Sequence, residues 1–426
     1  MRRSRTAATR ARRRIIPVAA ASLLAAVLTA GLAVASSPAG AAGGIRVPER
    51  DPFYAVPANI AQYADGAVID SRVVDATTFG LPLPANGWQV KYRTEDELGA
   101  PTATVTTVLV PKLAWTGAGP RPLLSYQTAE DGVAGRCAPS YALRAGLLAG
   151  FSNSVAETSL IGAALLQGWA VTVPDYEGPQ SEFLVSGVQA RAVLDGIRAA
   201  RSFTPAGVAA SAPLGVWGYS GGSLASITAA QLQPSYAPDV HLTAIAVGGL
   251  VADIRASINA FDGGFAGGAV PMGINGFLRH YPELNLLQYL NASGRRKVAR
   301  TAGDCIVQAA ARYPFLKISS IVSAPNALDS PPVVAMLNEN SPLYRSGVPQ
   351  APIYHYQAVA DELAPIGPAR TLLHQFCAAG VVVQSVEPPG GEHIEETIAG
   401  APGALQFLAR RFAGDAPVNT CATIPN

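Results

Sequence analysis

Short apolar runs that end in polar or glycine-rich residues recur along the chain from about residue 85 onward. Runs of this length, rich in β-branched residues and bounded by turn residues, predict strands. The strands predicted in this way are residues 89–92, 103–110, 123–127, 169–173, 214–217, 242–247, 352–359 and 381–386. Between two of them, residues 186–203 carry apolar side chains at helical spacing. The alternation of strands and helices predicts an α/β fold, with a mainly parallel sheet covered by helices on both faces.

Two segments break this alternation. Residues 42–85 are rich in proline, and we expect them to wrap the surface. Residues 251–350 begin with closely spaced glycines and continue with helical, aromatic-rich sequence. We interpret this second segment as a helical cap inserted between two strands and lying over a substrate pocket. The alternative is a structural elaboration with no role at the site. The core would then comprise residues 42–250 and 351–426.

The first 41 residues have the organisation of a secretory signal peptide. Seven arginines precede an apolar, alanine-rich run, and residues 39–41 read Ala-Gly-Ala, a small-residue cleavage pattern. The alternative is a membrane anchor, because about twenty apolar residues can span a bilayer. We expect cleavage after Ala41, a secreted protein and no stable membrane insertion.

Charge and cysteine content narrow the function classes further. Without the seven arginines, 24 basic and 29 acidic residues remain, a net charge of about −5. This balance gives no basic surface for nucleic acid. The four cysteines, Cys137, Cys305, Cys377 and Cys421, predict two disulfides in an exported protein, and three pairings are open. No Cys-x-x-Cys spacing occurs and there are five histidines, so we expect neither a metal site nor a cofactor.

The most informative motif is residues 218–222, which read Gly-Tyr-Ser-Gly-Gly. An apolar run precedes it and a predicted helix follows. Gly-x-Ser-x-Gly between a strand and a helix is typical of the nucleophile elbow of α/β-hydrolases, where a serine sits on a sharp turn at the top of the sheet. The motif therefore predicts that Ser220 is the nucleophile of an acyl-transfer reaction.

A serine nucleophile needs a base, and a carboxylate to orient that base. In this fold the chain order is Ser, then Asp or Glu, then His. His393 follows the last predicted strand and precedes a predicted helix, which is where catalytic groups collect in parallel sheets. Asp361 directly follows the predicted strand 352–359, with Glu362 as the adjacent alternative. We expect a triad of Ser220, Asp361 and His393.

The negative charge that forms on the substrate oxygen requires N–H donors. One donor should be the backbone N–H of Gly221, the residue after the nucleophile. The second should come from the loop after strand 123–127, where Asp131 and Gly132 are the candidates. Residues 175–178 read Asp-Tyr-Glu-Gly and form another polar loop at a strand end. This loop is either part of the site or a turn whose carboxylates are already satisfied.

Taken in order, six short segments resemble the secretory lipase family, which includes the yeast lipase A enzymes and secreted actinobacterial lipases. They are Glu130-Asp131, Cys-Ala-Pro-Ser-Tyr at 137–141, Asp-Tyr-Glu-Gly at 175–178, the serine motif at 218–222, Asp361-Glu362 and Gly-Glu-His at 391–393. The resemblance covers nearly the whole chain after the signal segment. It implies an α/β-hydrolase core, a helical cap between nucleophile and acid, and hydrolysis of carboxylic esters, often triacylglycerols.

The resemblance also implies residue roles. It supports the triad Ser220, Asp361 and His393, and makes Asp131 an oxyanion residue beside Gly221. It suggests the disulfides Cys137–Cys305 and Cys377–Cys421. Some members carry a long C-terminal flap over the substrate entrance, and here we expect the flap to be short or missing.

The sequence predicts a secreted serine ester hydrolase that acts on small-molecule ester or lipid substrates, including at a lipid–water interface. Two alternatives within the fold are a secreted peptidase and a short-chain esterase without lipase activity. A third is a hydrolase-like binding protein, which would lack a triad member. The sequence does not distinguish a monomer from an oligomer.

Overall fold

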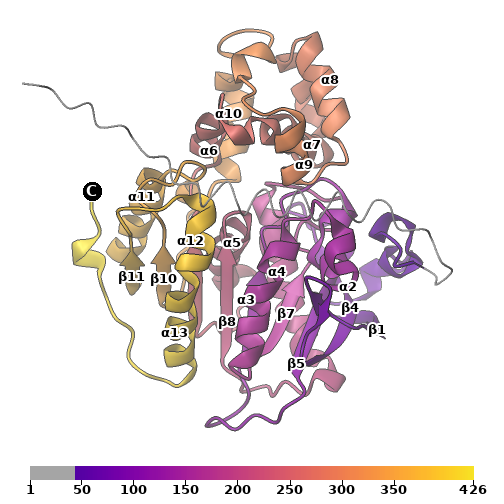
Figure 1. The fold of residues 1–426 in the computed structure, drawn as a ribbon, viewed down its shortest axis with the longest axis vertical. Helices are drawn as coiled ribbons and strands as arrows, with labels where there is room; N and C mark the ends of the chain where they lie inside the picture. Colours follow the sequence, from indigo (N-terminus) through magenta and orange to yellow (C-terminus); the bar gives the residue numbers. More distant parts are fainter. Residues whose placement is uncertain (1–43) are drawn as a thin grey trace, which may run out of the picture. The chain divides into compact units, whose positions relative to one another are not determined.

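The computed structural model describes residues 44–426, so the expected signal peptide at 1–41 lies outside the described residues. A nine-stranded sheet with the order β1-β4-β5-β7-β6-β8-β9-β10-β11 runs through this part of the chain (Figure 1). Its strands are β1 Val68–Val73, β4 Ala85–Glu95, β5 Pro101–Pro111, β6 Leu123–Gln127, β7 Ala170–Pro174, β8 Leu214–Tyr219, β9 Ala244–Gly248, β10 Ile353–Tyr356 and β11 Val383–Val386. A separate hairpin pairs β2 Thr77–Thr78 with β3 Leu81–Pro82.

The predicted mainly parallel sheet is confirmed. Strands β7, β6, β8, β9, β10 and β11 pair in parallel, while β1, β4 and β5 are antiparallel. The expectation that 42–85 only wraps the surface was wrong, because β1 forms an edge of the sheet. Its sequence, Val-Ile-Asp-Ser-Arg-Val, has polar residues on an edge that is largely exposed, so it lacks the apolar run of a buried strand.

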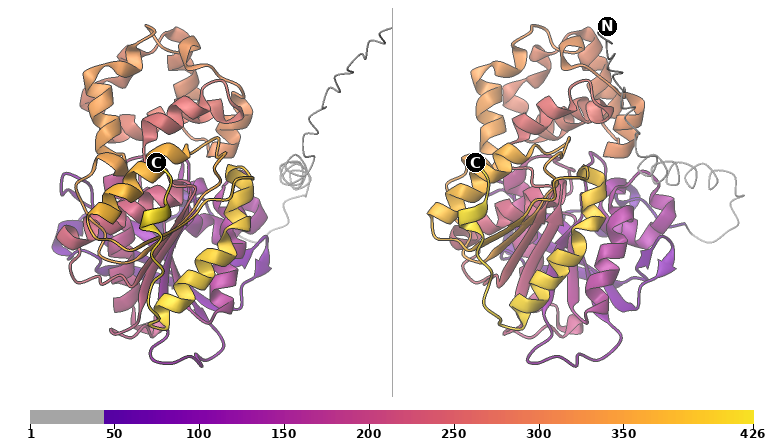
Figure 2. Two further views of the ribbon diagram at one scale, coloured as in Figure 1. Left: turned by 90° about the vertical axis from the view of Figure 1, so that its left-hand side faces the viewer. Right: turned by 60° about the vertical axis from the view of Figure 1, so that its left-hand side comes forward.

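Helices cover both faces of the sheet, as Figure 2 shows. The helices of the core are α2 Pro139–Ala145, α3 Ser154–Leu166, α4 Ser186–Ser202, α5 Gly221–Tyr236, α11 Ile366–Ala378, α12 His393–Ala399 and α13 Ala401–Phe412. Apolar side chains of α4, α5 and α11 pack on one face, and those of α3 and α13 pack on the other. The central strands are therefore buried from both sides, which explains their continuous apolar runs.

Between β9 and β10 the chain forms a helical insertion, residues 251–350, drawn in orange in Figure 1. Its helices are α6 Ile254–Phe261, α7 Ala269–His280, α8 Ala292–Thr301, α9 Ile306–Arg312 and α10 Pro331–Glu339. Apolar residues of α6, α7 and α10 pack against Val185, Val188 and Leu224 of the core. The insertion thus has its own apolar contact with the start of α4 and the first turn of α5.

Two disulfides bond Cys137 to Cys305 and Cys377 to Cys421. These are the pairs that the family resemblance implied. The first joins the start of α2 to the insertion, and the second joins α11 to the C-terminal segment. Among residues 44–426, no helix is both long and apolar enough to cross a lipid bilayer.

Candidate active site

Ser220 lies on the turn between β8 and α5 with φ 53° and ψ −123°. This backbone conformation is unfavourable for any residue with a side chain, so hydrogen bonds with neighbouring groups must stabilise it. The Ser220 N–H donates to the Gly248 carbonyl (3.0 Å), and its own carbonyl accepts from the Ser223 N–H (2.8 Å) and hydroxyl (2.6 Å). The turn also needs its glycines, because a Cβ on Gly218 would lie 2.2 Å from the Gly222 carbonyl oxygen.

The three predicted triad side chains meet at this turn. His393 Nε2 lies 2.8 Å from Ser220 Oγ, and His393 Nδ1 lies 2.8 and 2.9 Å from the two carboxylate oxygens of Asp361. Asp361 and His393 are buried, whereas Ser220 is partly exposed. The structure thus brings together groups from three chain segments in a continuous hydrogen-bonded series, with the hydroxyl at the accessible end.

Groups of the loop that carries Asp361 donate hydrogen bonds to its carboxylate and fix its orientation. Its carboxylate accepts the N–H groups of Leu363 (3.0 Å) and Ala364 (2.8 Å) and the side-chain amide of Gln357 (3.2 Å). Glu362, the alternative acid, accepts the backbone N–H of His393 (3.1 Å) and does not contact the imidazole ring. The ring is therefore oriented by Asp361, and Glu362 supports the first turn of α12.

The other four histidines lie elsewhere. His355 is buried in β10, where it contacts Ser385 and Gln357, and burial lowers its pKa. His280 contacts Glu182, His374 contacts the Pro425 carbonyl, and His241 is exposed. Through Gln357, His355 is connected indirectly to Asp361, a link that the sequence did not indicate.

Asp131 lies beside Gly221. A Cβ on Gly221 would be only 1.9 Å from Asp131 Oδ1, so the carboxyl group fills the space next to this glycine. Asp131 has φ 36°, and burial raises its pKa to about 6, against the effects of the His393 charge and a hydrogen bond with Asn153. Within residues 44–426, the backbone N–H groups of Asp131 and Gly221 donate to no protein acceptor. Gly132, the other sequence candidate, faces Cys305 in a β-bridge whose hydrogen bonds are made by the neighbouring residues Asp131 and Val133.

The loop at 175–178 is satisfied only in part: Asp175 is hydrogen-bonded, whereas neither carboxylate oxygen of the buried Glu177 has a hydrogen-bond partner in the described part of the chain. Asp175 accepts the backbone N–H of Ser140 at 2.8 Å and its hydroxyl at 2.5 Å. Burial raises the pKa of Asp175 to about 7, although these hydrogen bonds act in the opposite direction. Asp175 thus connects the end of β7 to α2 without contacting the triad. The tyrosine of the loop donates to the Thr128 carbonyl (2.7 Å) and accepts the Glu130 N–H (3.0 Å), so it supports the strand end that leads to Asp131.

Because burial raises the pKa values of several carboxyl groups, we expect the free energy of unfolding to fall as pH rises. Burial also raises the pKa of Glu157, to about 8. Glu157, Asp175 and Asp131 hold a proton in the folded chain at pH values where the unfolded chain, with carboxyl pKa values of about 4, has lost it. Their stabilising effect is complete below about pH 4 and is lost as pH rises through about 6 to 8. Urea unfolding midpoints measured from pH 5 to pH 8.5 should decrease steadily.

The matched variant for this prediction is Glu157→Gln. Glu157 accepts hydrogen bonds from the Tyr126 hydroxyl and the Ala129 N–H, both at 2.7 Å. The amide oxygen can accept the Ala129 N–H and the amide N–H can donate to the Tyr126 hydroxyl oxygen, so the variant keeps both partners. Because it cannot ionise, it should lose stability less steeply above pH 6. A midpoint that is constant or rises between pH 5 and pH 8.5 would contradict the prediction.

A cavity of about 590 Å³ opens near the site but not at the nucleophile. It lies between residues 48–55, the start of β5, and the loops at 133–138 and 178–181, and Arg279 of the insertion also lines it. In the described part of the chain, none of the three triad residues contributes to its lining.

Comparison with known proteins gives consistent matches over most of the chain. The family model described as "Secretory lipase" matches residues 146–420. Lipase 4 of Candida albicans is 36% identical over 387 residues, covering 88% of this chain and 83% of that protein. A Mycobacterium tuberculosis protein named "Probable inactive lipase" is 35% identical over 373 residues, covering 86% and 83% of the two chains. The crystal structure of Candida antarctica lipase A in its closed state matches with a TM-score of 0.83 and 32% identity, covering 90% of this chain and 91% of that one.

Proposed function

The chain belongs to the secretory lipase family of α/β-hydrolases and is a carboxylic ester hydrolase; from this premise we propose that Ser220, His393 and Asp361 are its nucleophile, base and acid. The observation that carries the proposal is the hydrogen-bonded series Ser220 Oγ–His393–Asp361, with distances of 2.8 to 2.9 Å. One relative is named a probable inactive lipase, whereas in this chain the three triad side chains are hydrogen-bonded in series. The geometry of this chain supports an active enzyme.

The first half of the reaction forms an acyl-enzyme. Ser220 Oγ attacks the ester carbonyl carbon while His393 Nε2 takes the hydroxyl proton. Asp361 accepts a hydrogen bond from the N–H at Nδ1, which keeps Nε2 free as the base and stabilises the imidazolium that forms. The tetrahedral intermediate then collapses, the carbon–oxygen bond to the alcohol breaks, and His393 returns its proton to the leaving alcohol.

The second half releases the acid. Water attacks the acyl carbon as His393 takes its proton, and the proton passes to Ser220 Oγ when the acyl bond breaks. In both halves the carbonyl oxygen carries negative charge for a short time. The N–H groups of Gly221 and Asp131 are the proposed donors that stabilise it, since the Asp131 carboxyl group packs beside Gly221 and neither N–H donates to a backbone acceptor among residues 44–426.

Lipid esters are the proposed substrates, and the helical insertion is the proposed cap. Ile394 and Ile398 follow the base on α12, four residues apart, and are 51% and 53% exposed. An apolar surface beside the catalytic base suits an acyl chain or a lipid–water interface better than a charged ligand. The family and the two disulfides support secretion, since disulfides persist in oxidising compartments.

The peptidase alternative would need free carboxylates to bind a charged amino terminus, and the insertion contains six acidic residues. Four acids of the insertion already have partners. Asp253 caps α6, Asp262 accepts the Ile318 N–H at 2.6 Å, Asp304 pairs with Arg312, and Asp329 pairs with Arg255. Carboxylates that are engaged in this way are not available to bind an amino terminus, so the ester substrate is favoured.

Substrate class is tested with p-nitrophenyl esters from C2 to C18, emulsified triolein and aminoacyl anilides. We expect turnover of the esters and of triolein, and none of the anilides. Activity confined to short dissolved esters would replace the lipase proposal by an esterase. Anilide hydrolysis without ester hydrolysis would contradict both.

A further inference from the structure

The loop that carries Asp131 is paired with the insertion through its backbone. The Val133 N–H donates to the Asp304 carbonyl (3.0 Å), and the Ile306 N–H donates to the Asp131 carbonyl (2.9 Å). Between these bonds, Gly132 and Cys305 form an antiparallel bridge. The loop at 131–133 thus completes a short two-stranded pairing with residues 304–306, which lie more than 150 positions later in the sequence.

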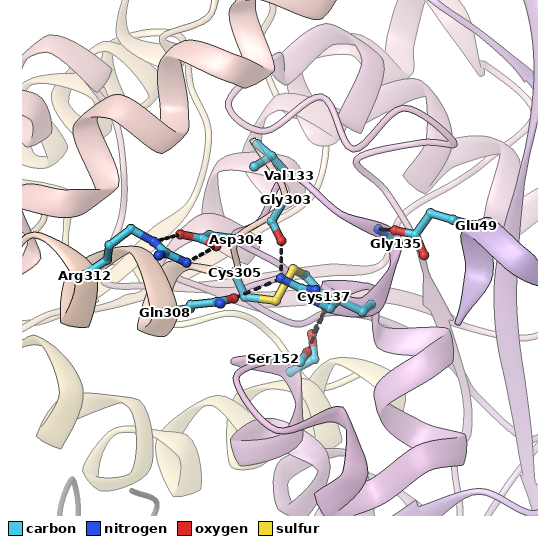
Figure 3. The surroundings of a disulfide bond; sticks show 12 residues. Glu49, Val133, Gly135, Cys137, Ser152, Gly303, Asp304, Cys305, Gln308 and Arg312 are labelled. Atoms are coloured by element: carbon cyan, nitrogen blue, oxygen red, sulfur yellow. Dashed lines mark hydrogen bonds and ion pairs between the residues drawn. A yellow bond between two sulfur atoms is a disulfide. The ribbon is translucent and has the colours of Figure 1, made fainter. Parts of the chain in front are cut away.

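The disulfide Cys137–Cys305 (Figure 3) connects the middle residue of this pairing to Cys137, five residues after Gly132. Both cysteines are fully buried. A Cβ on Gly132 would lie 2.5 Å from the Cys137 sulfur, so the Asp131 loop packs directly on the disulfide. Figure 3 also shows the Ser152 hydroxyl, which donates to the Cys137 carbonyl (2.8 Å).

Arg279, in the last turn of α7, also hydrogen-bonds this loop. Its Nη2 donates to the carbonyls of Val133 and Ala302, both at 2.8 Å. Its Nη1 donates to the carbonyls of Gln180 (2.5 Å) and Ser181 (3.0 Å). One guanidinium group therefore joins the Asp131 loop, the loop after β7 and the insertion.

We propose that Arg279 and the Cys137–Cys305 disulfide are positioning groups for the oxyanion hole, by which the insertion holds Asp131 against Gly221. This inference rests on the proposed roles of Ser220, Gly221 and Asp131. The backbone of Asp131 has a φ of 36°, a conformation that is unfavourable for residues with a side chain. Such a conformation persists only where the surroundings fix it, and here residues 304–306, the disulfide and Arg279 supply contacts to the loop.

The consequence is a specific kinetic signature. The ester carbonyl in the ground state is bound weakly by the oxyanion donors, whereas the tetrahedral oxyanion depends on them. Loosening the loop should therefore lower kcat and leave KM nearly unchanged. We expect a fall of about 10- to 100-fold, because a misplacement of about 1 Å can cost about 10²-fold in rate.

The test compares Arg279→Met and the double variant Cys137→Ser/Cys305→Ser with two matched controls. Arg295→Met removes an arginine that donates to two carbonyls, Leu287 and Leu290, inside the insertion. Cys377→Ser/Cys421→Ser removes the disulfide that lies away from the Asp131 loop. For each protein, kcat and KM are measured on p-nitrophenyl butyrate, together with the inhibition constant of an alkyl boronic acid, which mimics the tetrahedral intermediate.

We expect kcat to fall and the boronic acid to bind more weakly in the two test variants, with both quantities near wild type in the controls. Equal losses in test and control variants, or a wild-type kcat in Arg279→Met, would overturn the inference. If the cysteine double variant does not fold, Arg279→Lys serves in its place, since an ammonium group cannot reach all four carbonyls and should give an intermediate kcat. Ser220→Ala is measured in parallel, because activity in that variant would refute the proposed function instead.

Discussion

Replacing Ser220 by alanine is expected to lower kcat for ester hydrolysis by about 10⁴- to 10⁶-fold, because no acyl-enzyme can form. Replacing His393 by alanine should have an effect of similar size, since its Nε2 is the group within 2.8 Å of the serine hydroxyl that can take the proton. The double variant Ser220→Ala/His393→Ala should lose about as much activity as either single variant, because the two side chains act as one unit. Initial rates on p-nitrophenyl butyrate measure all three.

The control for this prediction is His241→Ala. His241 is exposed and lies before β9, so its loss should leave kcat at the wild-type value. The thermal midpoints of Ser220→Ala and His393→Ala should show that both variants remain folded. Full hydrolysis by a folded Ser220→Ala protein would rule out the assigned nucleophile.

The second large effect is expected from Gly221→Ala. The new Cβ would lie 1.9 Å from Asp131 Oδ1 and 2.9 Å from its Cγ, and because Asp131 is buried we expect the Asp131 loop or the turn at Ser220 to move. Either movement separates the two N–H donors, and losing one oxyanion donor costs about 10²- to 10³-fold in kcat. We expect a loss of this size with little change in KM, measured on the same ester.

Gly367→Ala is the matched control. A Cβ on Gly367, in the first turn of α11, would meet no atom within 4 Å. This variant should keep the wild-type kcat. If Gly221→Ala also keeps it, the space between Gly221 and Asp131 is not the site of oxyanion stabilisation.

The positions of the main strands along the chain could be predicted because the parallel strands are buried on both faces and therefore form continuous apolar runs. The site candidates could be located from the predicted strands, since Ser220, Asp361 and His393 each follow a strand and occur in the chain order typical of the fold. The structure places these side chains within hydrogen-bond distance, while their catalytic roles stay a prediction. Strand β1 was missed because an exposed edge strand has no continuous apolar run.

Other features depend on contacts that local sequence cannot reveal. The sequence left three disulfide pairings open, and only the family resemblance suggested the pairs that the structure contains. The bond from Arg279 to the Val133 carbonyl joins residues 146 positions apart and uses a backbone acceptor, which every residue provides. For the same reason, Asp175 could be a site residue or a satisfied turn until Ser140 was found within 2.8 Å of its carboxylate.

The dependence of Asp131 on the insertion gives the insertion two proposed roles. Its helices contact the core next to α5, and residues 304–306 hold the loop beside Gly221. A change in the insertion should therefore alter the rate of the chemical step as well as the substrate range.

The most direct measurement of the central claim is covalent labelling with an alkyl fluorophosphonate, followed by intact mass and peptide mapping. We expect one adduct per chain, located on Ser220, appearing in step with the loss of ester hydrolysis. The adduct should be absent from Ser220→Ala and form much more slowly in His393→Ala. An active wild-type enzyme that carries no adduct, or carries it on another residue while activity is lost, would contradict the assignment of Ser220 as the nucleophile.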